Sequence, residues 1–194
     1  MRSKTILLVE DNGNHRALTE EAIVRSSLAC QLVVAEDGNE AIDYLACAAT
    51  GRGCQHYGLP ALVLLSLKAG SECLQLLKRM RADLSTKRLP VVVLKDASDE
   101  EGTPVGLELG INSYIRKPDS AEEFTRTVQR ICGYWLLLNE PPPEPNPASW
   151  LLLPAASSRE LNPAAEAFDG MELAGGIGST CQPCLRRVKL PVAR

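Results

Sequence analysis

Short apolar runs alternate with stretches of helical periodicity along the first part of the chain. The apolar runs are rich in β-branched residues and predict five strands, over residues 5–9, 32–35, 61–65, 90–94 and 113–115. Between and after the strands, the spacing of the apolar positions predicts five helices. Strands and helices that alternate in this way predict an α/β fold, in which helices cover both faces of a parallel sheet.

The expected helices differ in how clearly the sequence defines them. The first two are expected over residues 13–27, with Asn12 as its N-cap, and over residues 39–48. The third has an apolar face with helical spacing, made by Cys73, Leu76, Leu77, Met80 and Leu84, which we expect in the core. The fourth, near residues 99–109, is interrupted by Pro104 and is expected to be short or kinked, because proline lacks a backbone donor.

The fifth expected helix carries more apolar surface than packing on the sheet requires. The apolar side chains are Phe124, Val128, Ile131, Trp135, Leu137 and Leu138. Monomers rarely expose patches of that extent. We therefore expect this face to form a homodimer, or a heterodimer with a related chain. In a monomer, the surplus leucines are expected to pack against residues 150–153.

Prolines mark the end of the predicted domain. Residues 141–147 are rich in proline, which predicts an extended, semi-rigid linker. Residues 148–194 show no sustained hydrophobic period and are predicted to be disordered. The expected organisation is a domain over residues 1–140, a linker over residues 141–147 and a tail over residues 148–194.

Charge and cysteine content narrow the classes of function. The net charge is -3, from 24 acidic and 21 basic residues, which argues against nucleic acid as a ligand. No apolar run has the length of a signal peptide or a membrane span, so a cytoplasmic protein is expected. The seven cysteines are expected to be reduced thiols. Cys181 and Cys184 form a lone C-x-x-C pair, and a zinc site there would have to be shared between two chains.

Polar residues follow the expected strands directly. Glu10 and Asp11 follow the first strand, Ser66 the third, Lys95 the fourth and Lys117 the fifth, after Arg116. The helix and strand order predicts a doubly wound, five-stranded parallel sheet with strand order 2-1-3-4-5, whose ligands lie outside the carboxyl ends of the strands. These side chains are therefore candidates for one shared crevice.

Four segments resemble the receiver domain of two-component response regulators. They are Ile-Leu-Leu-Val-Glu-Asp-Asn at residues 6–12, Leu-Val-Leu-Leu at 62–65, Leu-Pro-Val-Val-Val-Leu at 89–94 and Asn-Ser-Tyr-Ile-Arg-Lys-Pro at 112–118. The resemblance covers about the first 140 residues. It is closest to stand-alone receivers associated with phytochromes, which end in a similar Tyr-Trp, Leu-rich, Asn-Glu-Pro-Pro sequence, like residues 134–143. It implies a flavodoxin-like fold and a phosphorelay signalling module.

The resemblance also implies a phosphorylation site. In this family an acidic pair binds Mg2+, and an aspartate after the third strand accepts a phosphoryl group from a histidine kinase. A Ser or Thr after the fourth strand and a lysine before a proline stabilise the phosphoryl oxygens. Glu10 and Asp11 match the acidic pair, Lys117 matches the lysine, and Tyr114 matches an aromatic switch position.

Two positions depart from the family pattern. Ser66 stands at the acceptor position and Lys95 at the hydroxyl position. A serine hydroxyl needs an adjacent base, whereas an aspartate is already ionised at neutral pH. We expect the Lys95 ammonium to reach the acidic pair and to replace Mg2+, so that no cofactor remains; a retained metal would bind Asp11. In the alternative, Lys95 points to solvent.

These features predict a pseudo-receiver rather than an enzyme. It is expected to bind a histidine kinase, another receiver or a second copy of itself without being phosphorylated. The alternative is an active phosphoacceptor that uses Ser66 or a neighbouring carboxylate such as Asp96. A chain without a selected role is a third possibility. His15 and His56 are expected to be solvated polar residues.

Overall fold

The fold is described from a computed structural model of the chain. The described residues are 4–50, 58–66, 71–96, 109–140 and 186–188. The chain divides into two compact units, Met1–Asn139 with Cys181–Arg194 and Glu140–Thr180, and every described helix and strand belongs to the first. The expected fourth helix, the linker and most of the expected tail, including Cys181 and Cys184, lie outside the described residues.

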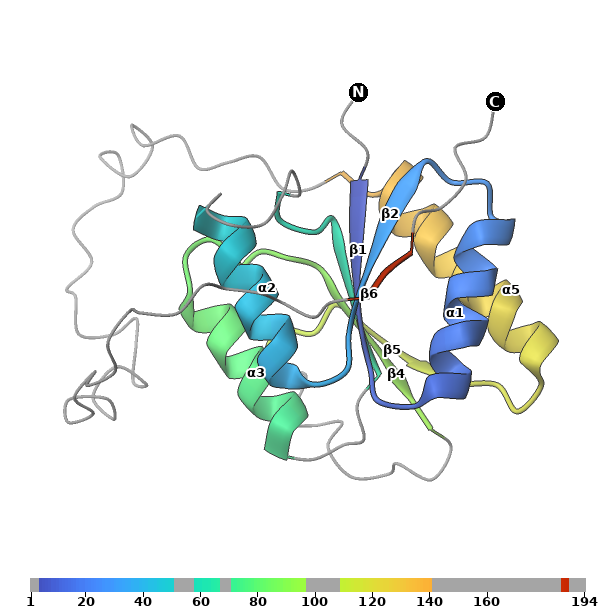
Figure 1. The fold of residues 1–194 in the computed structure, drawn as a ribbon, viewed down its shortest axis with the longest axis horizontal. Coiled ribbons are helices and arrows are strands. Elements are labelled where there is room, and N and C mark those ends of the chain that lie inside the picture. Colours follow the sequence, from blue (N-terminus) through green and yellow to red (C-terminus); the bar gives the residue numbers. More distant parts are fainter. Residues whose placement is uncertain (1–3, 51–57, 67–70, 97–108, 141–185, 189–194) are drawn as a thin grey trace, which may run out of the picture. The chain divides into compact units, whose positions relative to one another are not determined.

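The five expected strands form one parallel sheet. They are β1 (Lys4–Glu10), β2 (Cys30–Ala35), β3 (Leu62–Ser66), β4 (Val91–Lys95) and β5 (Ser113–Arg116). Their order is 2-1-3-4-5, as the sequence predicts. A sixth strand, β6 (Arg186–Val188), pairs antiparallel with β2 at the edge of the sheet (Figure 1). The sequence pattern did not predict this strand.

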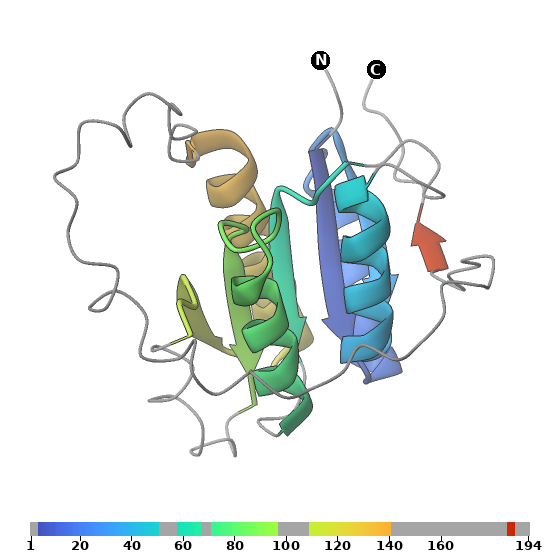
Figure 2. The ribbon, with the colours of Figure 1, turned by 90° about the vertical axis from the view of Figure 1, so that its left-hand side faces the viewer.

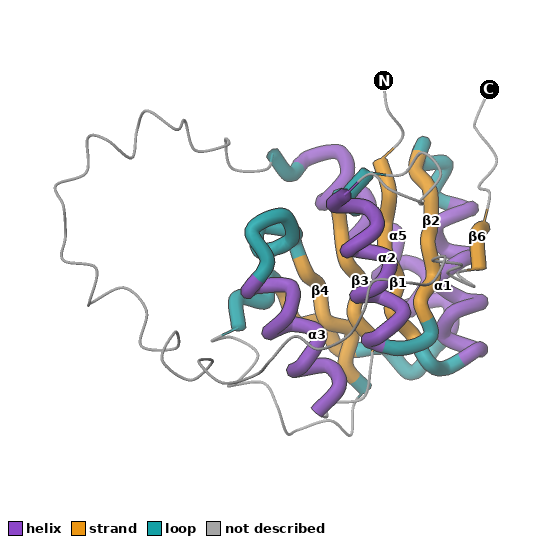
Figure 3. The backbone as a smooth tube through the Cα atoms, turned by 60° about the vertical axis from the view of Figure 1, so that its left-hand side comes forward, coloured by secondary structure: helices purple, strands orange, loops and turns teal. Residues whose placement is uncertain are grey.

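Two of the described helices cover each face of the sheet: Figure 1 shows the sheet edge-on between them, and Figure 2 shows the sheet from one face. The helices are α1 (Gly13–Arg25), α2 (Gly38–Thr50), α3 (Ser71–Ala82) and α5 (Ala121–Gly133), which continues into the π-helix η1 (Tyr134–Leu138). Helices α1 and α5 pack together on one face, and α2 and α3 pack on the other (Figures 1 and 3). No described helix has the length and apolar character that crossing a membrane would require.

The alternation of side chains along each strand divides the core into two layers. In β1, Leu7 and Val9 face α2 and α3, whereas Ile6 and Leu8 face α1 and α5. Successive side chains of a strand point to opposite faces. A strand covered on both faces is therefore apolar throughout, which explains the continuous apolar runs in the sequence.

The third helix is shorter than its apolar pattern. It ends at Ala82, and Leu84, expected on the core face, is 79% exposed. The Asp83 carboxylate accepts hydrogen bonds from the backbone N–H and the hydroxyl of Ser85. A local turn of this kind competes with helix continuation. The prediction for Leu84 is therefore wrong.

Only part of the dimer face expected on the fifth helix is exposed. Phe124, Val128 and Ile131 are buried in the core against the sheet, so they are unavailable to a partner and that part of the prediction is wrong. Trp135 is partly buried against the same cluster. The exposed large apolar side chains at this end are Tyr134, Leu137 and Leu138.

Candidate functional site

The carboxyl ends of the strands border a small polar cavity. Its volume is about 220 Å³, and its lining is Glu10, Asp11, Asn12, His15, Ser66, Asp96 and Lys117. The β1–β3 register places Glu10 directly opposite Ser66. Residue 96 follows β4 and residue 117 follows β5, so four segments of the sheet edge supply the lining. The structure thus brings together Glu10, Asp11, Ser66 and Lys117.

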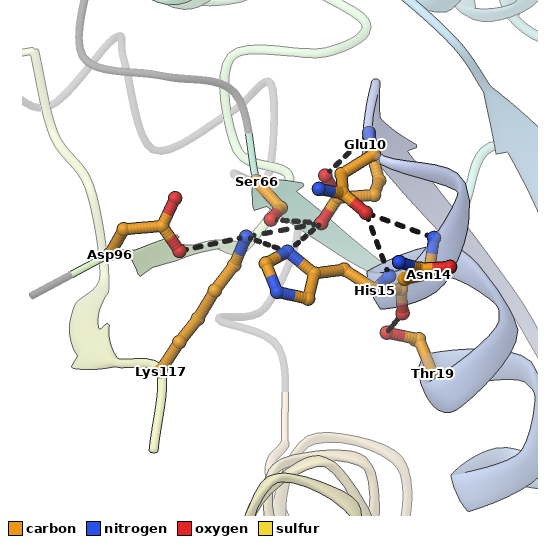
Figure 4. Close-up of polar contacts among 8 residues, drawn as sticks. Glu10, Asn14, His15, Thr19, Ser66, Asp96 and Lys117 are labelled. Atoms are coloured by element: carbon orange, nitrogen blue, oxygen red, sulfur yellow. Dashed lines mark hydrogen bonds and ion pairs between the residues drawn. The ribbon is translucent and has the colours of Figure 1, made fainter. Parts of the chain in front are cut away.

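Glu10 is the centre of the polar network (Figure 4). Its side chain is 1% exposed. The Ser66 hydroxyl donates to Oε2, and the Lys117 ammonium lies 3.2 Å from the same oxygen. The backbone N–H of Asn12 donates to Oε1 at 3.0 Å. Both carboxylate oxygens are therefore engaged, as a buried charge requires.

Lys117 supplies the positive charge of the cavity. Its side chain is 6% exposed, and its Nζ lies 3.2 Å from Glu10 Oε2 and 3.3 Å from Asp96 Oδ1. The Lys117 backbone N–H donates to the Lys95 carbonyl at 2.8 Å, which fixes the chain just beyond β5. One ammonium thus bridges two carboxylates that come from different strand ends.

Lys95 does not take the expected place. It is the last residue of β4 and half-buried, and it is not among the residues that line the cavity. The next residue, Asp96, lines the cavity instead, with a side chain that is 38% exposed. Neighbouring residues of an extended chain point in opposite directions, so only one of the two faces the cavity. The prediction that Lys95 neutralises the acidic pair is wrong; the ammonium that pairs with Glu10 is that of Lys117.

His15 is a site residue that the sequence analysis missed. Its Nδ1 lies 2.9 Å from Lys117 Nζ and 3.8 Å from Glu10 Oε2. Its ring stacks on Phe124 with centroids 5.8 Å apart. Since an ammonium only donates, Nδ1 accepts and the ring proton is assigned to Nε2. The sequence feature that could have pointed to His15 is its place in the first turn of α1, three residues after the N-cap Asn12.

Asp11 and Tyr114 occupy contrasting environments. Asp11 lines the cavity and is exposed. Tyr114, in β5, packs against the core cluster on the α2 and α3 side and is not among the residues that line the cavity. Burial raises the pKa of the Tyr114 hydroxyl, with a smaller contribution from Cys73. Tyr114 is therefore a core-facing side chain in this conformation.

The described residues do not fit the Mg2+ that the family resemblance implies. Within the described part of the chain, no three His, Cys, Asp or Glu side chains are placed to hold a metal ion. Glu10 is fully engaged, and the Lys117 ammonium lies between Glu10 and Asp96. A divalent cation there would meet a positive charge at close range.

Comparison with known proteins assigns the family. No protein-family model matches the chain. The probable methanogenesis regulatory protein FilR2 of Methanothrix harundinacea is 36% identical over 141 residues, which cover 71% of this chain and 86% of that protein. Response regulator Rcp1 of Synechocystis sp. is 33% identical over 137 residues, which cover 69% and 89%. The chain is a response regulator receiver protein.

Solved structures agree with this assignment. The phosphorylated cyanobacterial phytochrome response regulator RcpA superposes on this receiver with a TM-score of 0.64 and 31% identity, over 73% of this chain and 100% of RcpA. The bacteriophytochrome response regulator AtBRR gives a TM-score of 0.55 and 35% identity, over 72% and 100%. The predicted flavodoxin-like fold and the resemblance to phytochrome-associated receivers are confirmed.

Proposed function

We propose that this receiver works without phosphorylation and acts by binding protein partners, such as a sensor histidine kinase or another receiver. The observation that carries the proposal is the Ser66 hydroxyl at the end of β3, hydrogen-bonded to buried Glu10. A serine hydroxyl is a weak nucleophile unless a base removes its proton. Glu10 is the adjacent carboxylate, and accepting that proton would break its buried ion pair with Lys117.

A second candidate is an active phosphoacceptor that uses Ser66 or Asp96. Asp96 favours it, because this carboxylate lines the cavity, is 38% exposed and lies 3.3 Å from Lys117. A carboxylate, unlike a serine hydroxyl, needs no adjacent base to act as a nucleophile. Against it stands the ion pair with Lys117, which phosphorylation of Asp96 would have to rearrange.

The deciding experiment is incubation with acetyl phosphate and Mg2+, followed by intact-mass measurement. We expect no added phosphoryl group on the natural chain, with a phosphorylatable receiver in the same reaction as the positive control. Ser66→Ala and Asp96→Asn are the matched variants. An adduct that Ser66→Ala removes and that resists hydroxylamine would establish a phosphoserine. An adduct that Asp96→Asn removes and that hydroxylamine cleaves would establish an acyl phosphate. Either adduct overturns the proposal.

The proposal includes the loss of the metal site. Titration with Mg2+, followed by amide NMR, is expected to leave the amides of Asp11 and Ser66 unshifted. The physical reason is that both oxygens of Glu10 are engaged, and that the Lys117 ammonium between Glu10 and Asp96 repels a cation at close range. Saturable shifts at Asp11 at physiological Mg2+ concentration would contradict this part.

A homodimer and a cytoplasmic location, both expected from the sequence, also belong to the proposal.

A further inference from the structure

Strand β2 is the edge of the parallel part of the sheet. One side of β2 pairs with β1, from Lys4 opposite Cys30 to Val9 opposite Ala35. The other side pairs antiparallel with the C-terminal segment Arg186–Val188, where Leu32 lies opposite Val188 and Val34 opposite Arg186. Figures 2 and 3 show β6 at this outer edge. The chain thus covers its own sheet edge with a segment that is distant in sequence.

The edge beneath β6 is well suited to pairing with another strand. β2 is Cys-Gln-Leu-Val-Val-Ala, and five of its six residues are buried. An apolar edge strand with unpaired backbone groups is a template for pairing with another chain. β6 lies opposite Leu32, Val33 and Val34 only, so the ladder it forms is shorter than the strand beneath it.

We propose that the segment Arg186–Val188 is an edge guard, which closes β2 and prevents it from pairing with the β2 edge of a second copy. Two copies of one edge are self-complementary about a two-fold axis when they pair antiparallel. A pair of six-residue β2 strands offers a longer ladder than the three-residue β6. The second copy is therefore the competitor that the guard must exclude.

Pairing of β2 with β6 and pairing of β2 with a second copy depend differently on the protein concentration. β6 and β2 belong to one chain, so their pairing is an intramolecular event with a fixed effective concentration. Pairing of two β2 edges strengthens as the protein concentration rises. The guard therefore dominates in dilute solution, and its removal exposes a concentration-dependent association.

The test uses the full chain with Arg187→Pro and Val188→Pro. Antiparallel pairing alternates between bonded and non-bonded residue pairs, so one of two adjacent residues must donate to β2. Proline removes that donor whichever residue carries it. The matched control is Arg187→Lys with Val188→Ile, which keeps charge, apolar character and both N–H groups. Amide hydrogen exchange in β2 and sedimentation velocity are measured at low and high micromolar concentrations.

The expected result has two parts. At low concentration, the β2 amides that face away from β1 exchange roughly tenfold faster or more in the proline variant, whereas the amides that bond to β1 stay protected and report an intact fold. At high concentration the variant forms an assembly with twice as many chains as the natural protein forms at that concentration, and the outward amides regain protection. The control behaves like the natural chain. Unchanged exchange in the proline variant overturns the proposal, and so does faster exchange without this added association at any concentration.

Discussion

At the scale of single residues, the ion pair between Glu10 and Lys117 dominates the site. Both side chains are almost fully buried, and their N–O distance is 3.2 Å. A buried pair contributes little beyond the cost of desolvating its two charges. Removing one partner is different, because the other charge is then left buried without compensation. Loss of either side chain is therefore expected to destabilise the folded chain.

Lys117→Met is expected to lower the free energy of unfolding by about 3 kcal/mol, because it leaves Glu10 buried and unpaired. Urea unfolding measures this change. The control is Lys78→Met, at an exposed position of α3, which should change stability by less than about 0.5 kcal/mol. Adding Glu10→Gln to Lys117→Met should restore part of the loss. Equal stability of the two lysine variants would show that the pair carries no such energy.

Burial of thiols gives the folded chain a pH dependence in alkaline solution. Burial, with a smaller contribution from Cys30, raises the pKa of Cys132 from 9.0 to about 12. Burial also raises the pKa of Cys30 and of Cys73 to about 11. Above pH 9.0 the unfolded chain releases these protons and the folded chain keeps them. Their contribution to stability is therefore complete below pH 9.0 and is lost as pH rises toward about 12.

Cys132→Ala should make this loss less steep by about 1.4 kcal/mol per pH unit, because one thiol contributes that slope between its two pKa values. The measurement is the free energy of unfolding at several pH values above 9.0 under reducing conditions. Cys47→Ala, at a partly exposed position of α2, is the control. The cavity left by Cys132→Ala shifts all values equally, so only the slope is compared. Identical slopes for both variants would contradict the prediction.

At the scale of elements, the end of the fifth helix is set by its hydrogen bonds. The Asn139 N–H donates to the Tyr134 carbonyl at 2.8 Å, five residues back, as in a π-helix. The Lys4 ammonium, at the start of β1, donates to the Leu136 carbonyl. The wider turn changes which leucine faces the sheet. Leu136 is buried, whereas Leu137 and Leu138 are 70% and 74% exposed.

Leu136→Ala is expected to cost about 3 kcal/mol of stability, the usual range for a buried leucine. Leu138→Ala should cost less than about 0.5 kcal/mol, since that side chain is exposed. Thermal or urea unfolding of the two variants provides the comparison. A regular α-helix would place Leu138 on the face of Phe124 and Val128. A larger loss for Leu138→Ala than for Leu136→Ala would therefore exclude the π-helix.

At the scale of the whole molecule, the described surface has one feature that a folded monomer does not explain. Tyr134, Leu137 and Leu138 are exposed together at the end of the fifth helix. Phe124, Val128 and Ile131, which the sequence analysis assigned to the same interface, are instead buried under the helix. The proposed homodimer therefore rests on the exposed leucines and their neighbour Tyr134.

Leu137→Glu with Leu138→Glu is expected to give monomers in sedimentation equilibrium, because burying two carboxylates at an interface is costly. The control is Leu84→Glu, which places one carboxylate at a leucine that is 79% exposed beyond the end of α3. That variant should associate like the natural chain. If the natural chain is monomeric at high concentration, the proposed dimer is wrong.

The sequence by itself determined the elements and the faces they bury. The five parallel strands are local apolar runs, and α2, α3 and α5 have an apolar face with helical spacing. The order of these elements leaves one sheet topology. The same reasoning placed Glu10, Asp11, Ser66 and Lys117 at one edge, since each follows a parallel strand closely. Helix ends were less predictable, because the turn after Ala82 and the π-helix depend on individual hydrogen bonds.

The tertiary structure alone decided how the site is neutralised. Whether Lys95 or Asp96 faces the cavity depends on the direction of the chain where β4 ends, which hydrophobic periodicity does not encode. His15 meets Lys117 across 102 positions of sequence, and no local pattern reports such a contact. β6 is three residues long, too short for a period, and it forms because the β2 edge offers backbone partners. Local patterns therefore specify elements, whereas contacts between distant segments specify the chemistry.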